Sequence, residues 1–313
     1  MTHHPDRILT GIALMLGFCV TAPLIDVFSK LAAQATPVGT VTLSRFVVQS
    51  LLMAPIVVGM GLSWRLSGKA VWLTLARALV SILATFCFIA AVKVMPIADT
   101  LAIAFVEPFI ILLIGYLVLK EQVGPRRLAA SCVGFLGVLL VIQPSFSVFG
   151  PVAFLPLGTA LFFALYILIT RSLTRLCHPV AMQFHTGLFA VVLCVPMFLA
   201  AKSLTGEAAL AIVWPRGIDV LWCFGVGLAA TISHMAMTYA LKMAPSSTLA
   251  PLHYMEMVTA ALLGYLVFGD WPNVLTWAGI IVIVGSGLYI IHRERLAARS
   301  ARLATVSVSA EPR

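Results

Sequence analysis

Two glutamates stand inside long apolar runs of this sequence, where an ionised carboxylate is costly. Glu107 occurs in "AFVEPFIILLIGYLVLKEQVG", residues 104–124, and is followed at once by Pro108. Glu256 occurs in "HYMEMVTAALLGYLVFGD", residues 253–270. Proline removes the helical hydrogen bond to the carbonyl group four residues earlier, so a polar backbone group accompanies the Glu107 carboxylate. Such groups are tolerated in a membrane only where they contact protein or water, which predicts a wet pathway lined by both glutamates.

A histidine accompanies the second glutamate. His253 precedes Glu256 by three residues, so an α-helix would place both side chains on one face. There they would form an ion pair or share a proton. Because histidine changes its charge near neutral pH, this pair suggests a site for proton coupling. The alternative is that the two glutamates are protonated and only bridge helices.

Two arginines and two further histidines also fall inside apolar segments. Arg45 lies deep enough in its segment for the guanidinium to bind an anionic group through two parallel hydrogen bonds. Arg77 lies near the predicted cytoplasmic end of its segment, where it either extends to the interface or contacts a substrate. His185 and His234 either line the cavity or hydrogen-bond neighbouring helices.

The remaining site candidates are aromatic or lie near a segment end. Trp222 and Tyr239 are positioned to stack on a flat substrate. Asp26, close to the outer end of the first apolar segment, is interpreted as part of a gate or an interface.

The composition indicates which solvent surrounds the protein. Of the 313 residues, 61% are hydrophobic and 10% are charged, and the mean hydropathy is +1.08. A soluble domain carries about 25% charged residues, so this chain is predicted to be a polytopic membrane protein. The net charge of +9 is attributed to cationic loops, because no basic patch with interleaved aromatic residues indicates a nucleic-acid partner. The six cysteines form no CxxC pair, so no metal or cofactor is expected.

The predicted fold is an all-α integral membrane protein with ten transmembrane helices, since a bilayer requires about 20 mostly apolar residues per helix. The predicted spans are residues 8–29, 37–60, 70–94, 97–119, 126–143, 150–170, 179–201, 216–242, 246–268 and 274–292. A polar tail, residues 293–313, is expected to be cytoplasmic and disordered.

Cationic residues predict the orientation of these spans. If the N-terminus is inside, the inner loops and the tail carry fourteen Lys and Arg residues and the outer loops carry four. Cytoplasmic loops are enriched in Lys and Arg, so both termini are predicted to be cytoplasmic.

The second half of the chain repeats the first. An offset of 149 residues aligns Glu107 with Glu256, Pro96 with Pro245, Lys93 with Lys242 and Gly115 with Gly264. The chain therefore divides into two five-helix units, residues 8–143 and 150–292. Because five is odd, the second unit is predicted to be inverted, an architecture that recurs in secondary transporters with a substrate site where the halves meet. Pro96, Pro108 and Pro245 are interpreted as hinges.

A family resemblance rests on residues 77–144. This stretch contains "KVMPIAD", then a span with an internal proline, then "GYLVLKE" before a glycine-rich span. In this pattern the chain resembles the EamA-type domain of the drug/metabolite transporter superfamily, with two such domains covering nearly the whole chain. The resemblance implies a central cavity and a bacterial inner-membrane location. Asp270 replaces the Glu expected in the second half, and Met257 stands where the first half has Pro108, so the halves are not expected to hinge equally.

The sequence therefore predicts a secondary transporter that moves a small organic metabolite by alternating access. The resemblance extends the substrate candidates to amino acids, riboflavin and S-adenosylmethionine. An intramembrane enzyme and a channel or scaffold are the alternatives. The chain is not expected to be an enzyme, because no HExxH, GxSxG or Walker A motif occurs. The expected partners are a small-molecule substrate and the lipid bilayer, with proton coupling and a homodimer as further interpretations.

The inverted repeat makes a testable prediction about the loops. Single cysteines at positions 93 and 242, in a background without the native cysteines, are expected to react with a membrane-impermeant maleimide from opposite sides of the bilayer. Cysteine 93 should be labelled in intact cells, and cysteine 242 only after the membrane is opened. Labelling of both from the same side would contradict the inverted repeat.

Overall fold

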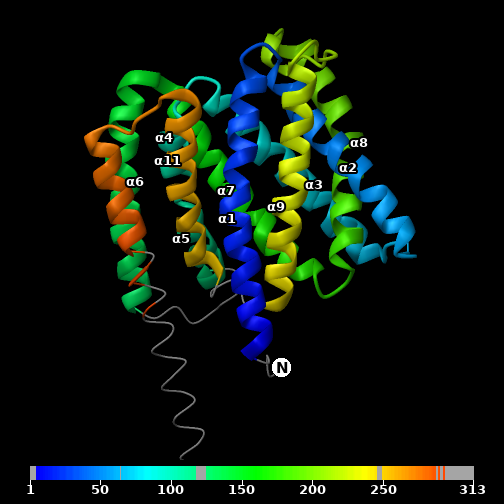
Figure 1. Ribbon diagram of the computed structural model, residues 1–313, viewed down its shortest axis with the longest axis horizontal. Coiled ribbons are helices and arrows are strands. Elements are labelled where there is room, and N and C mark those ends of the chain that lie inside the picture. Colours follow the sequence, from blue (N-terminus) through cyan, green and yellow to red (C-terminus); the bar gives the residue numbers. More distant parts are fainter. Residues whose placement is uncertain are drawn as a thin grey trace, which may run out of the picture.

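The structure, a computed structural model, describes residues 5–63, 65–117, 125–244 and 249–286, together with 288, 289 and 292. Within these residues it is a bundle of helices without a β-strand (Figure 1). The labelled helices are α1 (Pro5–Ala33), α2 (Val38–Gly59), α3 (Gly68–Val92), α4 (Ile97–Ala104), α5 (Glu107–Leu117), α6 (Pro125–Phe149), α7 (Leu155–Leu173), α8 (Pro179–Thr205), α9 (Asp219–Met243) and α11 (Tyr254–Phe268). Short 3-10 segments occur at η1 (Gly150–Phe154), η2 (Ala208–Leu210) and η3 (Ala250–His253), and a further helix covers Val274–Ser286.

The prediction of an all-α membrane protein is confirmed. Six helical stretches of the described chain are long and apolar enough to cross a bilayer: Ile8–Ala33, Val38–Gly59, Gly68–Val92, Ser145–Leu173, Pro179–Thr205 and Asp219–Met243. The total of ten spans stays a prediction. Pro245, Glu121 of the "GYLVLKE" motif and the tail 293–313 lie outside the described residues.

The fourth predicted span is interrupted next to Glu107. Helix α4 ends at Ala104, Phe105 and Val106 form a turn, and α5 begins at Glu107. Pro108 lacks the N–H that would bond to the carbonyl group of Ala104, and it is tolerated in the first turn of α5, where no such bond is needed. The position of the proline therefore explains why one predicted span is built from two helices.

The ninth predicted span is irregular at the corresponding place. The 3-10 segment η3 leads directly into α11, which begins at Tyr254. The offset of 149 residues relates η3 to the last turn of α4, so both halves depart from α-helical geometry just before their glutamate. Glu107 lies in the first turn of α5 and Glu256 in the first turn of α11.

The predicted position of the connection between the fifth and sixth spans is wrong. The sequence predicts that the fifth span ends at residue 143, whereas α6 continues to Phe149 and η1 follows without a loop. The chain turns at Gly150, whose φ of +61° is accessible to glycine at little cost. A glycine in an apolar context therefore marks this turn better than the polar residues before it.

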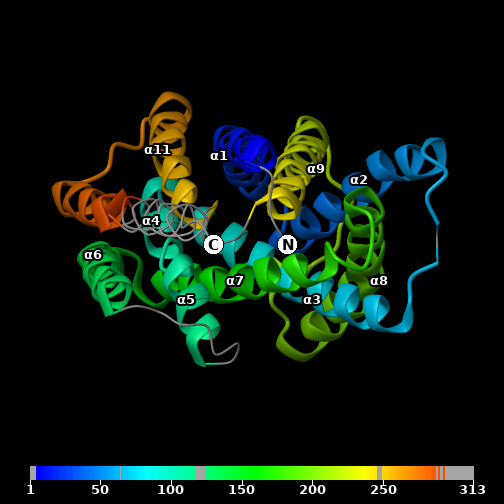
Figure 2. The same ribbon diagram turned by 90° about the horizontal axis from the view of Figure 1, so that it is seen from below.

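The main helix contacts follow the order expected for a repeat. Helix α1 packs along α9, and α3 packs along α7. By position in the two halves, α7 corresponds to α1 and α3 corresponds to α9, so the two contacts are counterparts. Helices α2 and α8, which correspond to each other, form a third pair, and Figure 2 shows all three pairs in the end-on view.

Helix α6 and the helix Val274–Ser286 lie together at one edge of the bundle (Figures 1 and 2). A Cβ atom at Gly137 would lie 3.1 Å from the carbonyl oxygen of Gly279, and one at Gly134 would lie 2.0 Å from Cζ of Phe109. Only small residues permit helices to approach so closely. Both glycines therefore serve helix packing within one chain.

Candidate functional site

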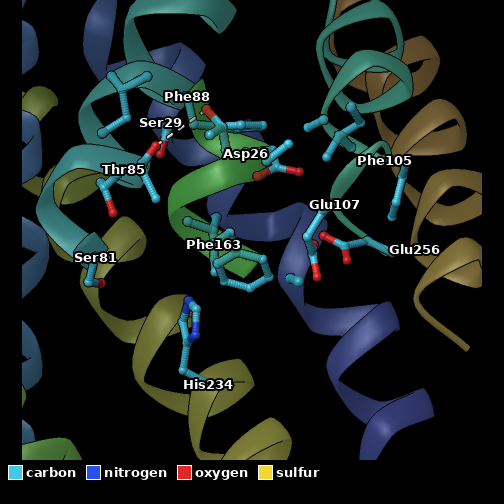
Figure 3. Close-up of a pocket in the computed structure, with 18 of the residues that line it drawn as sticks. Asp26, Ser29, Ser81, Thr85, Phe88, Phe105, Glu107, Phe163, His234 and Glu256 are labelled. Atoms are coloured by element: carbon cyan, nitrogen blue, oxygen red, sulfur yellow. Dashed lines mark hydrogen bonds between the residues drawn. The ribbon is translucent and has the colours of Figure 1, made fainter. Parts of the chain in front are cut away.

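A cavity of about 110 Å³ lies inside the bundle, lined by residues of α1, α2, α3, α4, α5, α7, α9 and α11. It therefore receives side chains from both halves of the chain. Figure 3 labels its polar residues Asp26, Ser29, Ser81, Thr85, Glu107, His234 and Glu256 and its aromatic residues Phe88, Phe105 and Phe163. Arg45 and Phe18 line the same cavity.

Glu107 and Glu256 both line the cavity, and their carboxyl groups project into it (Figure 3). The residues are only 5% and 9% exposed, respectively. Each glutamate lies in the first turn of a helix that starts inside the bundle. The N-terminal end of a helix carries partial positive charge, so the two helix interruptions offer favourable electrostatics to carboxylates that the apolar surroundings penalise.

His253 contacts the glutamate of the other half. Its Nδ1 lies 3.7 Å from Oε1 of Glu107, within ion-pair range but too far for a hydrogen bond. The imidazole ring also stacks on Phe18 with ring centroids 5.3 Å apart. The contact of His253 with Glu107 was not predicted, and the pairing of His253 with Glu256 stays a prediction. His253 ends the 3-10 segment η3 and α11 begins at Tyr254, and residues three apart share a face in either kind of helix.

Arg45 and His234 form the basic side of the cavity. The Arg45 guanidinium donates a hydrogen bond from Nη1 to the hydroxyl oxygen of Thr85, and its Nη2 lies 2.7 Å from Nε2 of His234. An arginine can only donate, so Nε2 of His234 accepts and the imidazole is neutral in this arrangement. Arg45 Nε and His234 Nδ1 are buried without a hydrogen-bond partner in the described part of the chain. Arg45 and His234, both predicted site residues, therefore line the cavity, and each has one nitrogen atom without a hydrogen-bond partner among the described residues.

Arg77 is not a cavity residue. Its side chain is fully buried, so the interpretation that it extends to the membrane interface is wrong. Its guanidinium donates to Thr170 (2.8 Å), Thr186 (2.5 Å), Tyr166 (2.5 Å) and Gln183 (2.9 Å). These partners lie on α7 and α8, so Arg77 ties α3 to both helices. Its position near the predicted span end was misleading because neighbouring helices, and not the membrane surface, surround it.

Three other candidates also lie away from the cavity lining. His185 is buried, and its Nδ1 lies 2.7 Å from the carbonyl oxygen one turn earlier in α8. Trp222 stacks against Phe28 with ring centroids 6.1 Å apart, and Tyr239 packs against His178. The aromatic pair therefore contributes to helix contacts, and the prediction that it stacks on substrate in this cavity is wrong.

Asp26, which the sequence predicts to be part of a gate or an interface, lines the cavity beside the glutamates. It is 6% exposed, and Oδ2 has no hydrogen-bond partner among the described residues. The first span was predicted to end at residue 29, whereas α1 continues to Ala33, which puts Asp26 a turn deeper. The sequence signal that could have identified Asp26 as a cavity residue is the occurrence of an acidic residue inside an apolar run.

The hinge candidates occupy positions next to the cavity. Pro96 is the N-cap residue of α4, with φ −57° and ψ 145°. Pro108 is the second residue of α5, beside Glu107. Their role as hinges stays a prediction.

Comparison with known proteins gives this geometry a context. The sequence model described as "EamA-like transporter family" matches residues 9–143 and 150–292. A protein named riboflavin transporter from Rhizobium johnstonii is 29% identical over 223 residues, covering 71% of this chain and 71% of that protein. A protein named S-adenosylmethionine uptake transporter from Rickettsia felis is 23% identical over 289 residues, covering 92% of this chain and 95% of that protein.

A solved crystal structure supports the fold independently. It superposes with a TM-score of 0.63 at 19% identity, covering 90% of this chain and 95% of the other. At this identity the likeness concerns the fold alone.

The Arg77 network predicts a loss of stability on conservative substitution. Arg77→Lys is expected to lower the thermal midpoint in detergent, because an ammonium group cannot reach partners on both α7 and α8. The loss should be at least the roughly 1.5–3 kcal/mol contributed by one hydrogen bond to a charged group. Arg216→Lys, at an exposed position, is the matched control. Equal midpoints for the two variants would contradict a structural role for the network.

Proposed function

Because the chain belongs to the EamA-like transporter family, we propose that it is a secondary transporter that moves a small organic metabolite across the bacterial inner membrane by alternating access. The family and its transporter-named relatives identify a transporter and not an enzyme. The observation that carries the proposal is the cavity between the two halves, into which Glu107 and Glu256 project.

The proposed mechanism requires two similar halves that exchange conformations. The family model matches the chain twice, over residues 9–143 and 150–292, which supports two five-helix units. The counterpart contacts α1 with α9 and α3 with α7 support the same division. In an inverted repeat, one half adopts the conformation of the other as access changes sides. Both termini are then cytoplasmic, as the loop charges predict.

The two ends of the cavity differ, as alternating access demands. Toward the start of α1, the residues Met15, Ile167, Met237 and Leu241 belong to a buried apolar cluster. Such a cluster excludes water and closes the side that the loop charges assign to the cytoplasm. Transport would require this cluster to separate while the opposite end closes.

The opposite end carries polar contacts between the helices that must move. Lys30, near the end of α1, forms an ion pair with Asp270, which follows α11, and its ammonium group lies 4.6 Å from the ring centroid of Phe268. Asp99 in α4 accepts a hydrogen bond from Thr276 at 2.9 Å. Lys30 and Asp270 are partly exposed, whereas Asp99 and Thr276 are buried, and we assign to these contacts the role of forming and breaking during a transport cycle.

The two glutamates are assigned the coupling role. A carboxyl group in the cavity binds a proton when no cation accompanies it and releases the proton when one does. His253, 3.7 Å from Glu107, offers a second proton acceptor in the same place. Proton binding and substrate binding are therefore linked at the cavity.

The test is transport by carboxamide variants. Glu107→Gln and Glu256→Gln are each expected to reduce saturable uptake into proteoliposomes by at least about tenfold, or about 1.4 kcal/mol, with membrane insertion intact. Radiolabelled riboflavin and S-adenosylmethionine are the probes, measured with and without a proton gradient between about pH 5.5 and about pH 8. Glu207→Gln, an exposed residue after α8, is the control.

Two outcomes separate the alternatives. Uptake that saturates and exchanges with internal substrate identifies a transporter, whereas a channel neither saturates nor shows counterflow. If both carboxamide variants transport a probe like the unmodified protein at every pH, the carboxylates are structural and the coupling role fails.

A further inference from the structure

The cavity has an unbalanced set of charged groups. Asp26, Glu107 and Glu256 contribute three carboxyl groups, and Arg45 is the only Lys or Arg among the described lining residues. Arg45 already contacts Thr85 and His234. Because charges interact strongly where the dielectric constant is low, three carboxylates facing one guanidinium repel one another. This repulsion is relieved only when carboxyl groups bind protons or when a further cation lies among them.

Two of the carboxyl groups have unused acceptor atoms. Oδ2 of Asp26 and Oε1 of Glu107 are buried and have no hydrogen-bond partner within the described chain. Both residues are more than nine-tenths buried, and Figure 3 shows their side chains at the cavity. A buried acceptor left without a donor destabilises the structure, because it has lost its hydrogen bonds to water. A ligand that brings a positive charge or N–H donors would remove this cost, whereas an anion would increase the repulsion.

Besides the polar residues named above, the wall contains aromatic and aliphatic side chains. Phe18, Phe88, Phe105 and Phe163 line the cavity together with Ile25, Ile89 and Leu101. An aromatic face attracts a cation that lies within about 6 Å of its centroid. Phenylalanine offers this attraction but, unlike tyrosine, has no hydroxyl group that could form a hydrogen bond with a ligand. Aromatic faces beside carboxylates are the combination that binds a poorly hydrated organic cation.

From these three features we infer that the transported metabolite is an organic cation, with a single positive charge carried on or next to a flat or apolar body. The inference rests on the proposed transport function and names its substrate class. The positive group lies among Asp26, Glu107 and Glu256, and the apolar body contacts the phenylalanines. Anionic metabolites are rejected, because Arg45 alone cannot offset three carboxylates.

A competition with protons follows from the same arrangement. The cation replaces the protons that the carboxyl groups hold in the empty cavity, so each binding event releases protons to the solvent. Lower pH favours the protonated carboxyl groups and weakens cation binding. The other basic groups nearest the acids are His253 from η3, His234 from α9 and Arg45 from α2, and the Arg45 guanidinium stays charged over this pH range and so does not add to the trend.

The experiment compares probes that share a body and differ in charge. Binding to the purified full-length protein in nanodiscs is measured for S-adenosylmethionine and for S-adenosylhomocysteine, which lacks the sulfonium methyl group and its charge. Benzyltrimethylammonium and benzenesulfonate form a second pair. Each cation is expected to bind at least about tenfold more tightly than its partner, about 1.4 kcal/mol, and more tightly at about pH 8 than at about pH 5.5.

Variants assign the effect to the cavity. Asp26→Asn and Glu107→Gln are expected to reduce cation binding at least about tenfold, while Glu107→Asp retains the preference for cations and Glu207→Gln leaves binding unchanged. The aspartate variant keeps the test valid if a carboxamide variant fails to fold.

The possible results are distinct from those for transport itself. The substrate class is overturned if neither cation binds. It is also overturned if each cation binds no more tightly than the partner that lacks its positive charge. If riboflavin, an uncharged probe, shows saturable counterflow while the cations do not bind, the transport function stands and the cation inference falls. If the cations bind as expected but no probe is transported, the inference about the site stands and the transport function falls.

Discussion

The central constraint on this fold is the cost of placing carboxyl groups inside a membrane. An acidic residue at the centre of a bilayer costs at least about 2.5–3.5 kcal/mol on insertion scales. Among the described residues, Asp26, Glu107 and Glu256 lie in predicted spans, and the structure gathers them at one cavity. Two of them also sit at helix starts inside the bundle, where the helix dipole favours negative charge. The interrupted helices, the internal cavity and the packing of the two halves are three consequences of this one requirement.

Contacts of different strength surround this cavity. The Arg77 network ties α3 to α7 and α8 with four hydrogen bonds, and close glycine contacts join α6 to the helix Val274–Ser286. By contrast, the contacts around Lys30 and Asp270 are few and partly exposed. Both of these strong contacts join a helix of the first half of the chain to helices of the second half, so the two halves do not separate as independent bodies along the sequence boundary.

Much of the arrangement was predictable from the sequence because repetition doubles each signal. The paired glutamates and the position of Pro108 predicted a wet site at the interface of the halves, and both glutamates line the cavity. Predictions failed where they depended on the exact end or geometry of a helix. Asp26 was placed too near the end of its span because α1 extends to Ala33, and the contact of His253 with Glu107 was not predicted because it joins segments far apart in the sequence. The aromatic wall escaped notice for a different reason: a phenylalanine facing a cavity and one facing lipid look alike in a sequence.

The claim that both glutamates face one water-accessible cavity can be measured directly. Single cysteines at positions 107 and 256, in a protein whose six native cysteines are replaced, are exposed to a small charged methanethiosulfonate reagent in sealed vesicles. Both cysteines are predicted to react, because a thiol ionises and reacts only where water reaches it, and reaction at either position should slow reaction at the other. Cysteines that stay unreactive at both positions in the folded protein, while a cysteine at exposed position 207 reacts, would contradict the account.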